Sequence, residues 1–177
     1  MTAPATDAAR QAAIAQPTIV VEHAEDRDIG AISALNNLFA PDGLTLPRSE
    51  EFVTSHLQDY QVVRDSDGTV LGCVALDEYS PSLVELVSLA VAPGAQGRGL
   101  GRRLISAAEE LTRQRSYPEL FAITLADQLF LSMGFRESSI ELFPEKIARY
   151  QKISRSELSI GRKFCFSYRV EPYPMGS

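Results

Sequence analysis

Three glycines alternate with other residues just before an expected helix, at Gly97, Gly99 and Gly101. Because glycine has no Cβ, the backbone of such a segment can approach a ligand closely. The helix that begins here would add unpaired N–H groups and the positive end of its dipole. The segment from Gln96 to Arg102 therefore predicts a binding site for a phosphate or pyrophosphate group. The alternative is a glycine-rich entry to the helix that binds no ligand. This is less favourable, because glycines destabilise the start of a helix and nothing would then require them.

Glu85 is the second residue that could do chemistry. It is the only charged residue in the apolar run Leu83–Val91, and burying an unpaired carboxylate is costly. The alternative interpretation is an outward-facing, solvated or salt-bridged glutamate. Strand residues alternate between two faces, and the sequence does not say which face carries a cleft.

The elements that must position these residues follow from the apolar pattern. Leu83–Val91 reads as a buried strand, the glycines as a turn, and residues 99–115 as a helix. A right-handed crossover would place the strand at 120–124 parallel to and beside Leu83–Val91. The other expected elements are strands at 18–22, 60–64, 69–76 and 161–170, turns at 65–68 and 78–82, and helices from Asp26 or Asp28 to 39, at 50–57 capped by Ser49, at 127–133 and at 143–158.

This order predicts a mixed α+β domain around one twisted, mostly antiparallel sheet with one parallel pair. We expect the domain to span residues 18–170. Residues 1–17, rich in Ala, Thr and Pro, are expected to be a mobile leader, and 171–177 a loose tail.

Three kinds of glycine loop compete for this segment. A nucleoside-triphosphate loop needs Gly-Lys-Ser/Thr, but Gly101 is followed by two arginines. A dinucleotide loop needs G-x-G-x-x-G in a repeated βαβ unit, whereas this loop follows an antiparallel meander. The third pattern, [Q/R]-x-x-G-x-[G/A] after a strand ending in Val-x-Pro, matches at Gln96, Gly99, Gly101, Val91 and Pro93.

On these residues the chain resembles the GNAT superfamily of acetyl-CoA-dependent N-acetyltransferases. The segment 127–135 is similar to that superfamily's second coenzyme-side motif. The resemblance implies that backbone amides of the glycine segment hold the pyrophosphate of coenzyme A. It also implies that the pantetheine arm lies between two splayed strands, and that an N–H near residues 89–90 donates to the thioester oxygen. The coenzyme-binding residues that it implies are Leu89, Ala90, Val91, Gln96, Gly97, Arg98, Gly99, Leu100, Gly101, Arg102 and Phe130.

The acceptor amine must lose a proton before it attacks the thioester, because amines are mostly protonated at neutral pH. Glu85 matches the general-base glutamate of some GNAT members. The usual general acid is a tyrosine, and Phe130 stands in its place and cannot donate a proton. Tyr79, Ser88 and Tyr150 are alternatives, although we expect them to be a turn residue, a core filler and a helix-packing residue.

The acceptor is suggested by a narrower resemblance, to the acetyltransferase domain of N-acetylglutamate synthases, which act in arginine biosynthesis. It rests on Phe130, on the segment 46–49 with Arg48, and on the segment 143–156, where the arginine falls one position later than in that family. Arg48, Arg155 and Ser156 are the implied substrate-binding residues, since an arginine fork suits a carboxylate. We expect Lys146 to be an ordinary surface charge. Many such synthases carry a kinase-like domain, and this sequence is too short to include one.

Two alternatives to glutamate acetylation remain open. One is a GNAT enzyme for another amino acid, a polyamine or a protein N-terminus. The other is a catalytically degenerate module that only binds acyl-CoA, which the missing tyrosine would favour.

The composition excludes several classes of protein. A net charge of -6 and a pI near 5.0 argue against a general nucleic-acid binder. Cys73 and Cys165 lie in strand-like runs and are expected to be buried free thiols, with a disulfide left open. His23 and His56 have no metal-ligand spacing, so no metal is expected. The sequence contains no long apolar run and no secretory signal, so we expect the protein in the cytoplasm and not bound to a membrane. Its expected partner is a small-molecule amine, and a homodimer is left open.

Overall fold

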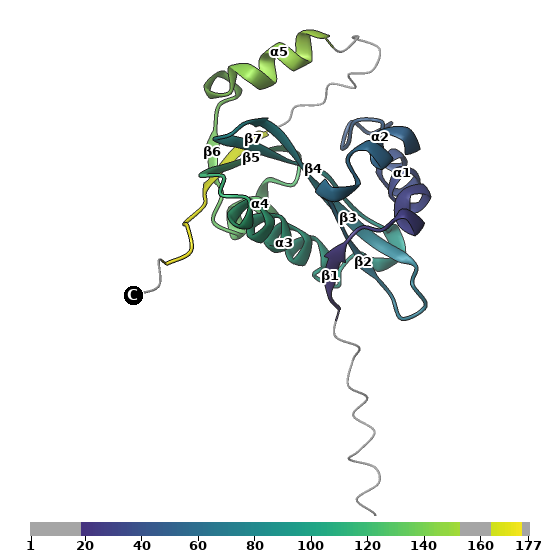
Figure 1. Cartoon of the computed structure of the whole chain (residues 1–177). Coiled ribbons are helices and arrows are strands. Elements are labelled where there is room, and N and C mark those ends of the chain that lie inside the picture. The colour runs from purple at the N-terminus through teal and green to yellow at the C-terminus, as the bar shows by residue number, and fades with distance from the viewer. Residues whose placement is uncertain (1–18, 153–163, 175–177) are drawn as a thin grey trace, which may run out of the picture.

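The computed structural model describes residues 19–152 and 164–174, and in these residues seven strands form one sheet of order β1-β2-β3-β4-β5-β7-β6. Only β4 and β5 run parallel, and all other neighbours are antiparallel (Figure 1). The expected mixed sheet with one parallel pair is confirmed. The strands are β1 (Val21–His23), β2 (Tyr60–Arg64), β3 (Val70–Ser80), β4 (Leu83–Val91), β5 (Glu119–Thr124), β6 (Arg136–Ser138) and β7 (Phe164–Arg169).

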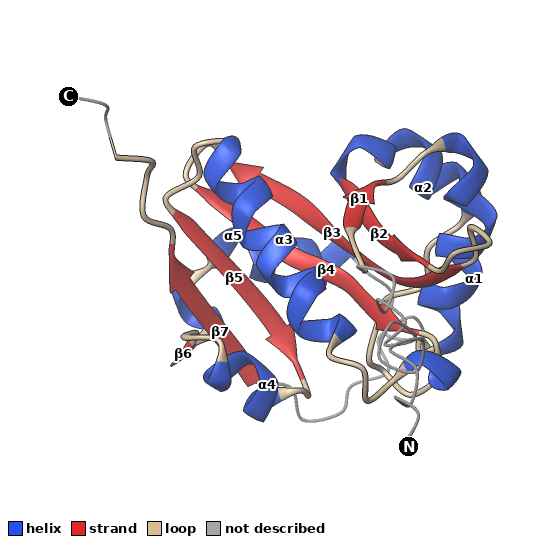
Figure 2. Ribbon diagram, turned by 90° about the horizontal axis from the view of Figure 1, so that it is seen from below, coloured by secondary structure: helices blue, strands red, loops and turns tan. Residues whose placement is uncertain are grey.

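Helices cover both faces of this sheet. The helices are α1 (Ile29–Leu38), α2 (Glu50–Ser55), α3 (Leu100–Gln114), α4 (Asp127–Ser132) and α5 (Pro144–Lys152), with 3-10 turns at Asp26–Asp28, Leu57–Asp59, Pro93–Ala95 and Ile140–Leu142. Helix α3 lies across one face, where its apolar side chains join the largest core cluster (Figure 2). On the opposite face, α1 and α2 pack over β2 and β3 through a second cluster, and Phe143, just before α5, packs on Phe121 of β5.

A β-bulge in β4 changes which of its residues face α3. Cys73 pairs with Ala90 and Ala75 with Val87, so β4 contains one residue more than β3 in this interval. Ser88, inside this bulge, has a φ of 54°, a left-handed conformation that is uncommon for residues other than glycine. Before the bulge, Val84 and Leu86 belong to the α3 cluster; after it, Leu89 and Val91 pack against that cluster. Glu85 therefore faces away from α3.

A second bulge lies in β3, at Tyr79. Glu78 pairs with Val84 and Ser80 with Leu83, so Tyr79 is the additional residue. Our expectation that Tyr79 lies in a turn is wrong, because β3 continues to Ser80 and the strands connect through residues 81 and 82. The Tyr79 ring meets Phe121 of β5 edge-on, with the ring centroids 5.5 Å apart.

The start of the first helix also differs from expectation. Asp28 stands at the N-cap of α1, but its carboxylate makes no cap hydrogen bond. Instead it accepts from Nε and Nη2 of Arg64, at 3.0 and 2.5 Å, and from the N–H of Glu25. Burial acts to raise the pKa of Asp28, but these hydrogen bonds outweigh it and hold that pKa below 3.8. Ser49, in contrast, caps α2 as expected by accepting from the N–H of Phe52.

Strand β6 was not anticipated. It has only three residues, Arg136–Ser138, and it pairs with β7 at the edge of the sheet. So short a segment has no readable alternation. The leader expected at 1–17 lies outside the described residues, as do Arg155 and Ser156.

Candidate active site

A cleft opens where the parallel strands separate. Residues Val84–Leu86 of β4 pair with Leu120–Ala122 of β5, and the pairing ends there. Beyond this point a cavity of about 200 Å³ lies between the strands, lined by residues 86–91 of β4 and 122–126 at the end of β5. Strand backbone without a neighbouring strand is free to pair with an extended ligand.

The glycine segment lies at the end of β4 and leads into α3. Gly97 and Gly99 have φ of 78° and 75°, and a Cβ at either would meet no protein atom within 4 Å. These two positions require glycine for their backbone conformation, and the space beside them is open to a ligand. Leu100 begins α3 with its side chain buried in the core, so only its backbone can face a ligand. The geometry fits the pyrophosphate site that the sequence suggests.

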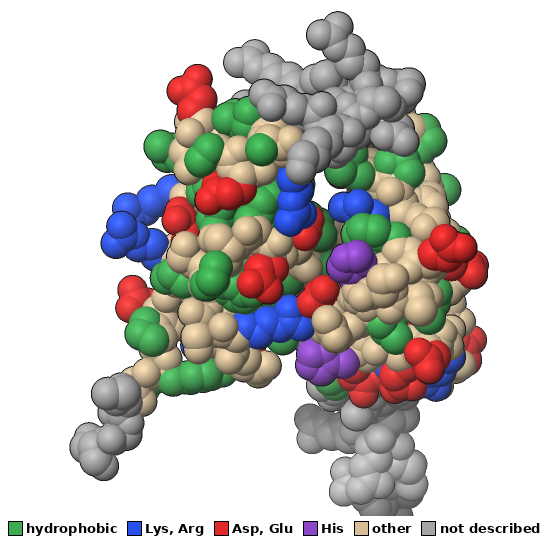
Figure 3. Space-filling view, turned by 45° about the horizontal axis from the view of Figure 1, so that its top comes forward, with side chains coloured by type: hydrophobic (Ala, Val, Ile, Leu, Met, Phe, Trp, Pro, Cys, Tyr) green, Lys and Arg blue, Asp and Glu red, His purple; other side chains and the backbone are tan. Residues whose placement is uncertain are grey.

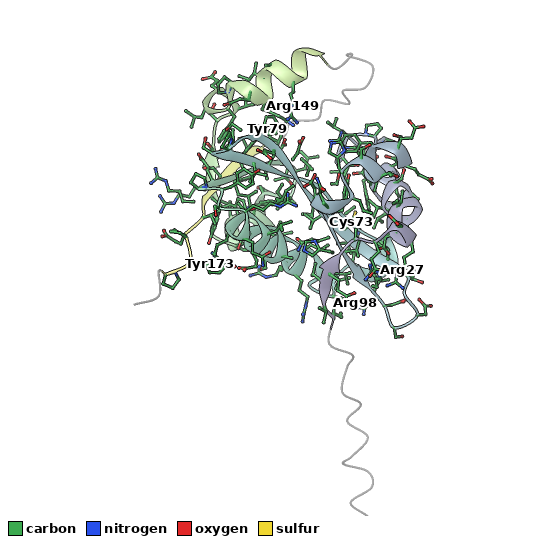
Figure 4. The ribbon with its side chains drawn as sticks, in the orientation of Figure 1. Arg27, Cys73, Tyr79, Arg98, Arg149 and Tyr173 are labelled. Carbon is green, nitrogen blue, oxygen red and sulfur yellow. The ribbon has the colours of Figure 1, made fainter. Side chains whose placement is uncertain are left out.

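The side chains around this segment are held differently from one another. Gln96 donates from Nε2 to the carbonyl oxygen of Val91, at 3.2 Å, which ties the loop to the end of β4. Arg102 donates to the Ser132 hydroxyl of α4 at 2.7 Å. Arg98 is exposed, on the side of the molecule away from Tyr79 and Arg149 (Figure 4). Coenzyme contacts of these residues stay predictions.

Glu85 lies on the sheet face opposite α3, only 3% exposed. Its Oε2 accepts from the Tyr79 hydroxyl at 2.7 Å and from Nζ of Lys146 at 2.8 Å. No described group bonds to Oε1. Glu85 therefore forms a salt bridge, as the alternative interpretation allowed. It does not face solvent, however, because it is buried beside a cavity.

Lys146 is buried at 5% exposure, so our expectation of a surface charge is wrong. Helix α5 carries it onto β4, where it forms the ion pair with Glu85. The sequence offered one signal in its spacing, because Lys146 follows the buried Phe143 by three residues, about one helical turn. Burial together with the Glu85 carboxylate raises the pKa of Tyr79, which therefore stays protonated as a donor.

A small chamber of about 50 Å³ surrounds this group, lined by Glu85, Lys146 and Arg48 together with residues 44–46, 86–88 and Ile123. It shares residues 86–88, Leu44 and Ile123 with the cleft between the strands. It shares Leu46, Arg48 and Lys146 with an outer vestibule of about 500 Å³. The chamber beside Glu85 therefore has the cleft as one neighbour and the vestibule as the other.

The vestibule lies between α2 and α5. Its walls carry Arg48, Phe52 and His56 on one side and Lys146 and Arg149 on the other. In the space-filling view, basic side chains gather around a hollow between the two halves of the molecule, with acidic side chains near its rim (Figure 3).

The cations of the vestibule differ in their partners. Arg149 pairs with Asp77 at 2.6 Å and lies over the Tyr79 ring, 3.8 Å from its centroid (Figure 4). Arg48 lies over the Phe52 ring at 4.2 Å and has no carboxylate partner among the described residues. Its Nε is buried without a hydrogen bond. Arg48 is thus the cation of this wall that is available to a carboxylate ligand.

Phe130 and Ser88, singled out from the sequence, both line the cleft. Phe130 is 1% exposed and packs edge-on against Phe135, and it offers no proton. The Ser88 hydroxyl lies 3.3 Å from the Tyr60 hydroxyl. Both cysteines are buried free thiols, as expected. In the described part of the chain we find no cluster of metal-ligating side chains, and no helix there is long and apolar enough to span a membrane.

Comparison with known proteins agrees with this geometry. The profile of the Acetyltransferase (GNAT) family matches residues 20–135. The chain belongs to the GNAT family. This acetyltransferase is 37% identical, over 129 residues, to an uncharacterized N-acetyltransferase of Chlorobaculum tepidum; the match covers 73% of the chain and 83% of that relative. The family's acyl donor is acetyl-CoA, and the cleft and glycine segment described above are suited to hold it.

Two further relatives of this acetyltransferase concern the acceptor. An amino-acid acetyltransferase of Neisseria meningitidis is 31% identical over 72% of the chain, which spans only 29% of that relative's length. The N-acetylglutamate synthase of Neisseria gonorrhoeae, solved with coenzyme A and N-acetyl-glutamate, superposes with a TM-score of 0.75 at 26% identity. That superposition covers 86% of this chain and 35% of the synthase.

Proposed function

We propose that this acetyltransferase transfers the acetyl group of acetyl-CoA to the α-amine of an amino acid, and that the amino acid is L-glutamate. The observation that carries the proposal is Arg48. It is a guanidinium with a buried, unpartnered Nε, and it lines the same chamber as Glu85. An amino acid whose α-carboxylate binds Arg48 would bring its amine into the chamber beside the Glu85 carboxylate. The amino-acid acetyltransferases among the relatives support this acceptor class.

Glu85 acts as the general base in this proposal. Its Oε2 is occupied by Tyr79 and Lys146, which leaves Oε1 to accept the proton of the substrate ammonium group. The two donors hold the carboxylate of Glu85, which lines the chamber, in one orientation. The neutral amine then attacks the acetyl carbonyl, and the C–S bond breaks as the amide bond forms.

The bulge in β4 supplies the second catalytic element. At Ser88 the strand leaves its regular pairing with β3, next to the residues 89–90 whose N–H groups are predicted to face the acyl group. A backbone N–H held there would donate to the carbonyl oxygen as its negative charge grows. Phe130 has no proton for the departing thiolate, so we assign no side chain to that step.

The acceptor is tested by measuring free thiol release from acetyl-CoA across a panel of L-glutamate, other amino acids, polyamines and a peptide N-terminus. We expect turnover with L-glutamate above all others. If another amine is acetylated and L-glutamate is not, the assignment of glutamate as the substrate is wrong. No turnover of any amine, with acetyl-CoA still bound, would favour the degenerate module.

The base is tested by Glu85→Gln, which keeps the shape of the side chain and removes the charge. We expect kcat to fall at least 100-fold, the lower range for general-base catalysis, while coenzyme binding is kept. Glu137→Gln, on the exposed edge strand β6, is the matched control and should leave kcat unchanged. An unchanged kcat in Glu85→Gln at every pH would exclude Glu85 as the base.

A further inference from the structure

The loop that carries Arg48 is held to α1 by the side chain of Asn37. The N–H of Arg48 donates to Oδ1 of Asn37 at 2.7 Å, and Nδ2 of Asn37 donates to the carbonyl oxygen of Arg48 at 2.9 Å. One side-chain amide thus satisfies both backbone groups of Arg48, as a neighbouring strand would. The Ser33 hydroxyl donates to the same carbonyl oxygen at 2.7 Å.

Asn36 extends this attachment along the loop. Its Nδ2 donates to the carbonyl oxygen of Leu46 at 2.7 Å and to Oδ1 of Asn37 at 3.0 Å. The hydroxyl of Thr45 donates to the Asn36 carbonyl oxygen. Asparagine is a weak helix former, so two consecutive asparagines in α1 are unfavourable for the helix alone. Their bonds to residues 45–48 account for their presence.

The guanidinium of Arg48 depends on this attachment for its position. Among the described residues, the guanidinium of Arg48 forms no ion pair. It stacks on the ring of Phe52 in α2. The direction of the side chain is therefore set by where the backbone of Arg48 lies and by stacking on that ring. Movement of the loop would carry the guanidinium away from the chamber that it shares with Glu85.

We propose that Asn37 is a positioning residue for the acceptor amino acid, acting through Arg48. This inference rests on the proposed function, in which Arg48 binds the acceptor's carboxylate. Asn37 itself touches no substrate. Its part is to hold Arg48 in the binding geometry before the substrate arrives, so that binding does not have to order the loop.

The test compares Asn37→Ala with Ser33→Ala and with Thr112→Val. Asn37→Ala removes two bonds to the backbone of Arg48 and Ser33→Ala removes one. Thr112→Val removes a buried hydroxyl bond within α3, far from the loop. We expect the KM for the acceptor to rise about ten-fold in Asn37→Ala, corresponding to about 1.4 kcal/mol. It should rise less in Ser33→Ala and stay unchanged in Thr112→Val, and the KM for acetyl-CoA should stay unchanged in all three.

Arg48→Ala separates this inference from the proposed function. If Arg48→Ala raises the acceptor KM and adding Asn37→Ala raises it no further, the two residues act as one unit. If Arg48→Ala raises the KM but Asn37→Ala and Ser33→Ala only lower Tm, Asn37 is merely structural and the inference is wrong. If Arg48→Ala leaves the KM unchanged, the proposed role of Arg48 fails and this inference fails with it. Ser33→Ala decides the question should Asn37→Ala not fold.

Discussion

The buried ion pair between Glu85 and Lys146 makes a specific prediction about stability. Their side chains are 4% and 7% exposed, and the two charged atoms are 2.8 Å apart. We consider three variants: Lys146→Met, Glu85→Gln and the double variant. Methionine approximates the length of lysine and glutamine the shape of glutamate, so packing changes little and charge changes most.

The magnitude follows from the burial of the pair. At an effective dielectric constant of about 20, unit charges at this separation attract by about 6 kcal/mol, but desolvating both ions offsets most of that gain. Removing only Lys146 leaves Glu85 as an unpaired buried charge, which costs about 3–5 kcal/mol. Removing both charges avoids that penalty, so the double variant should lie within about 1–2 kcal/mol of the wild type.

The assay is urea unfolding of the four proteins at neutral pH, read as a double-mutant cycle. We expect a coupling of about 3 kcal/mol or more. Arg149→Met is the matched control, because it removes another α5 cation that pairs with β3. Since Arg149 is 43% exposed at its side chain, its pair should contribute less than about 1 kcal/mol. The reasoning is refuted if Lys146→Met and Glu85→Gln each lower the free energy of unfolding by no more than Arg149→Met does, and if their effects add in the double variant.

Three further predictions concern the coenzyme loop, acid stability and the thiols. Gly99→Val should weaken acetyl-CoA binding at least about ten-fold by calorimetry, because φ is 75° there, whereas Gly94→Val, at ordinary φ and in open space, should not. Asp28→Asn should destabilise by about 2 kcal/mol at neutral pH. The pKa of Asp28 in the folded protein lies below 3.8, so the stabilising charge is present above that pH and is lost as the pH falls further. The free energy of unfolding of Asp28→Asn should therefore differ fully from that of the wild type above pH 3.8, and the difference should shrink in more acidic solution. A difference that does not change with pH would contradict this. Burial raises the pKa of Cys73 to about 12 and of Cys165 to about 11, so neither should react with iodoacetamide at pH 8 until urea unfolds the chain.

Local pattern was sufficient for most of the fold. The alternation and length of Leu83–Val91, the Asp-Gly turn after β2, and the glycines before α3 depend on neighbouring residues in the chain. Sequence alone therefore predicted the mixed sheet, its one parallel pair and the turn conformation of the glycine segment. The roles of Glu85 and Arg48 stay predictions, and Arg48 was suggested by the family resemblance and not by local pattern. The three-residue strand β6 carried too little pattern to be seen.

Tertiary structure decided which residues meet Glu85. No sequence spacing relates Tyr79, Glu85 and Lys146, which come from β3, β4 and α5. The pairing of β3 with β4 puts Glu85 opposite Asp77, two residues before Tyr79, and the packing of α5 brings Lys146 to the same face of the sheet. Tyr79 was expected in a turn and Lys146 at the surface, and both instead bond to the carboxylate. The sequence alone thus determined the backbone conformation of the glycine segment, because glycine permits positive φ locally at Gly97 and Gly99. The environment of Glu85, and the lack of an ion pair at Arg48 among the described residues, were decided only by the packing of α1, α2 and α5 against the sheet. Burial and ion pairing depend on residues far apart in the chain.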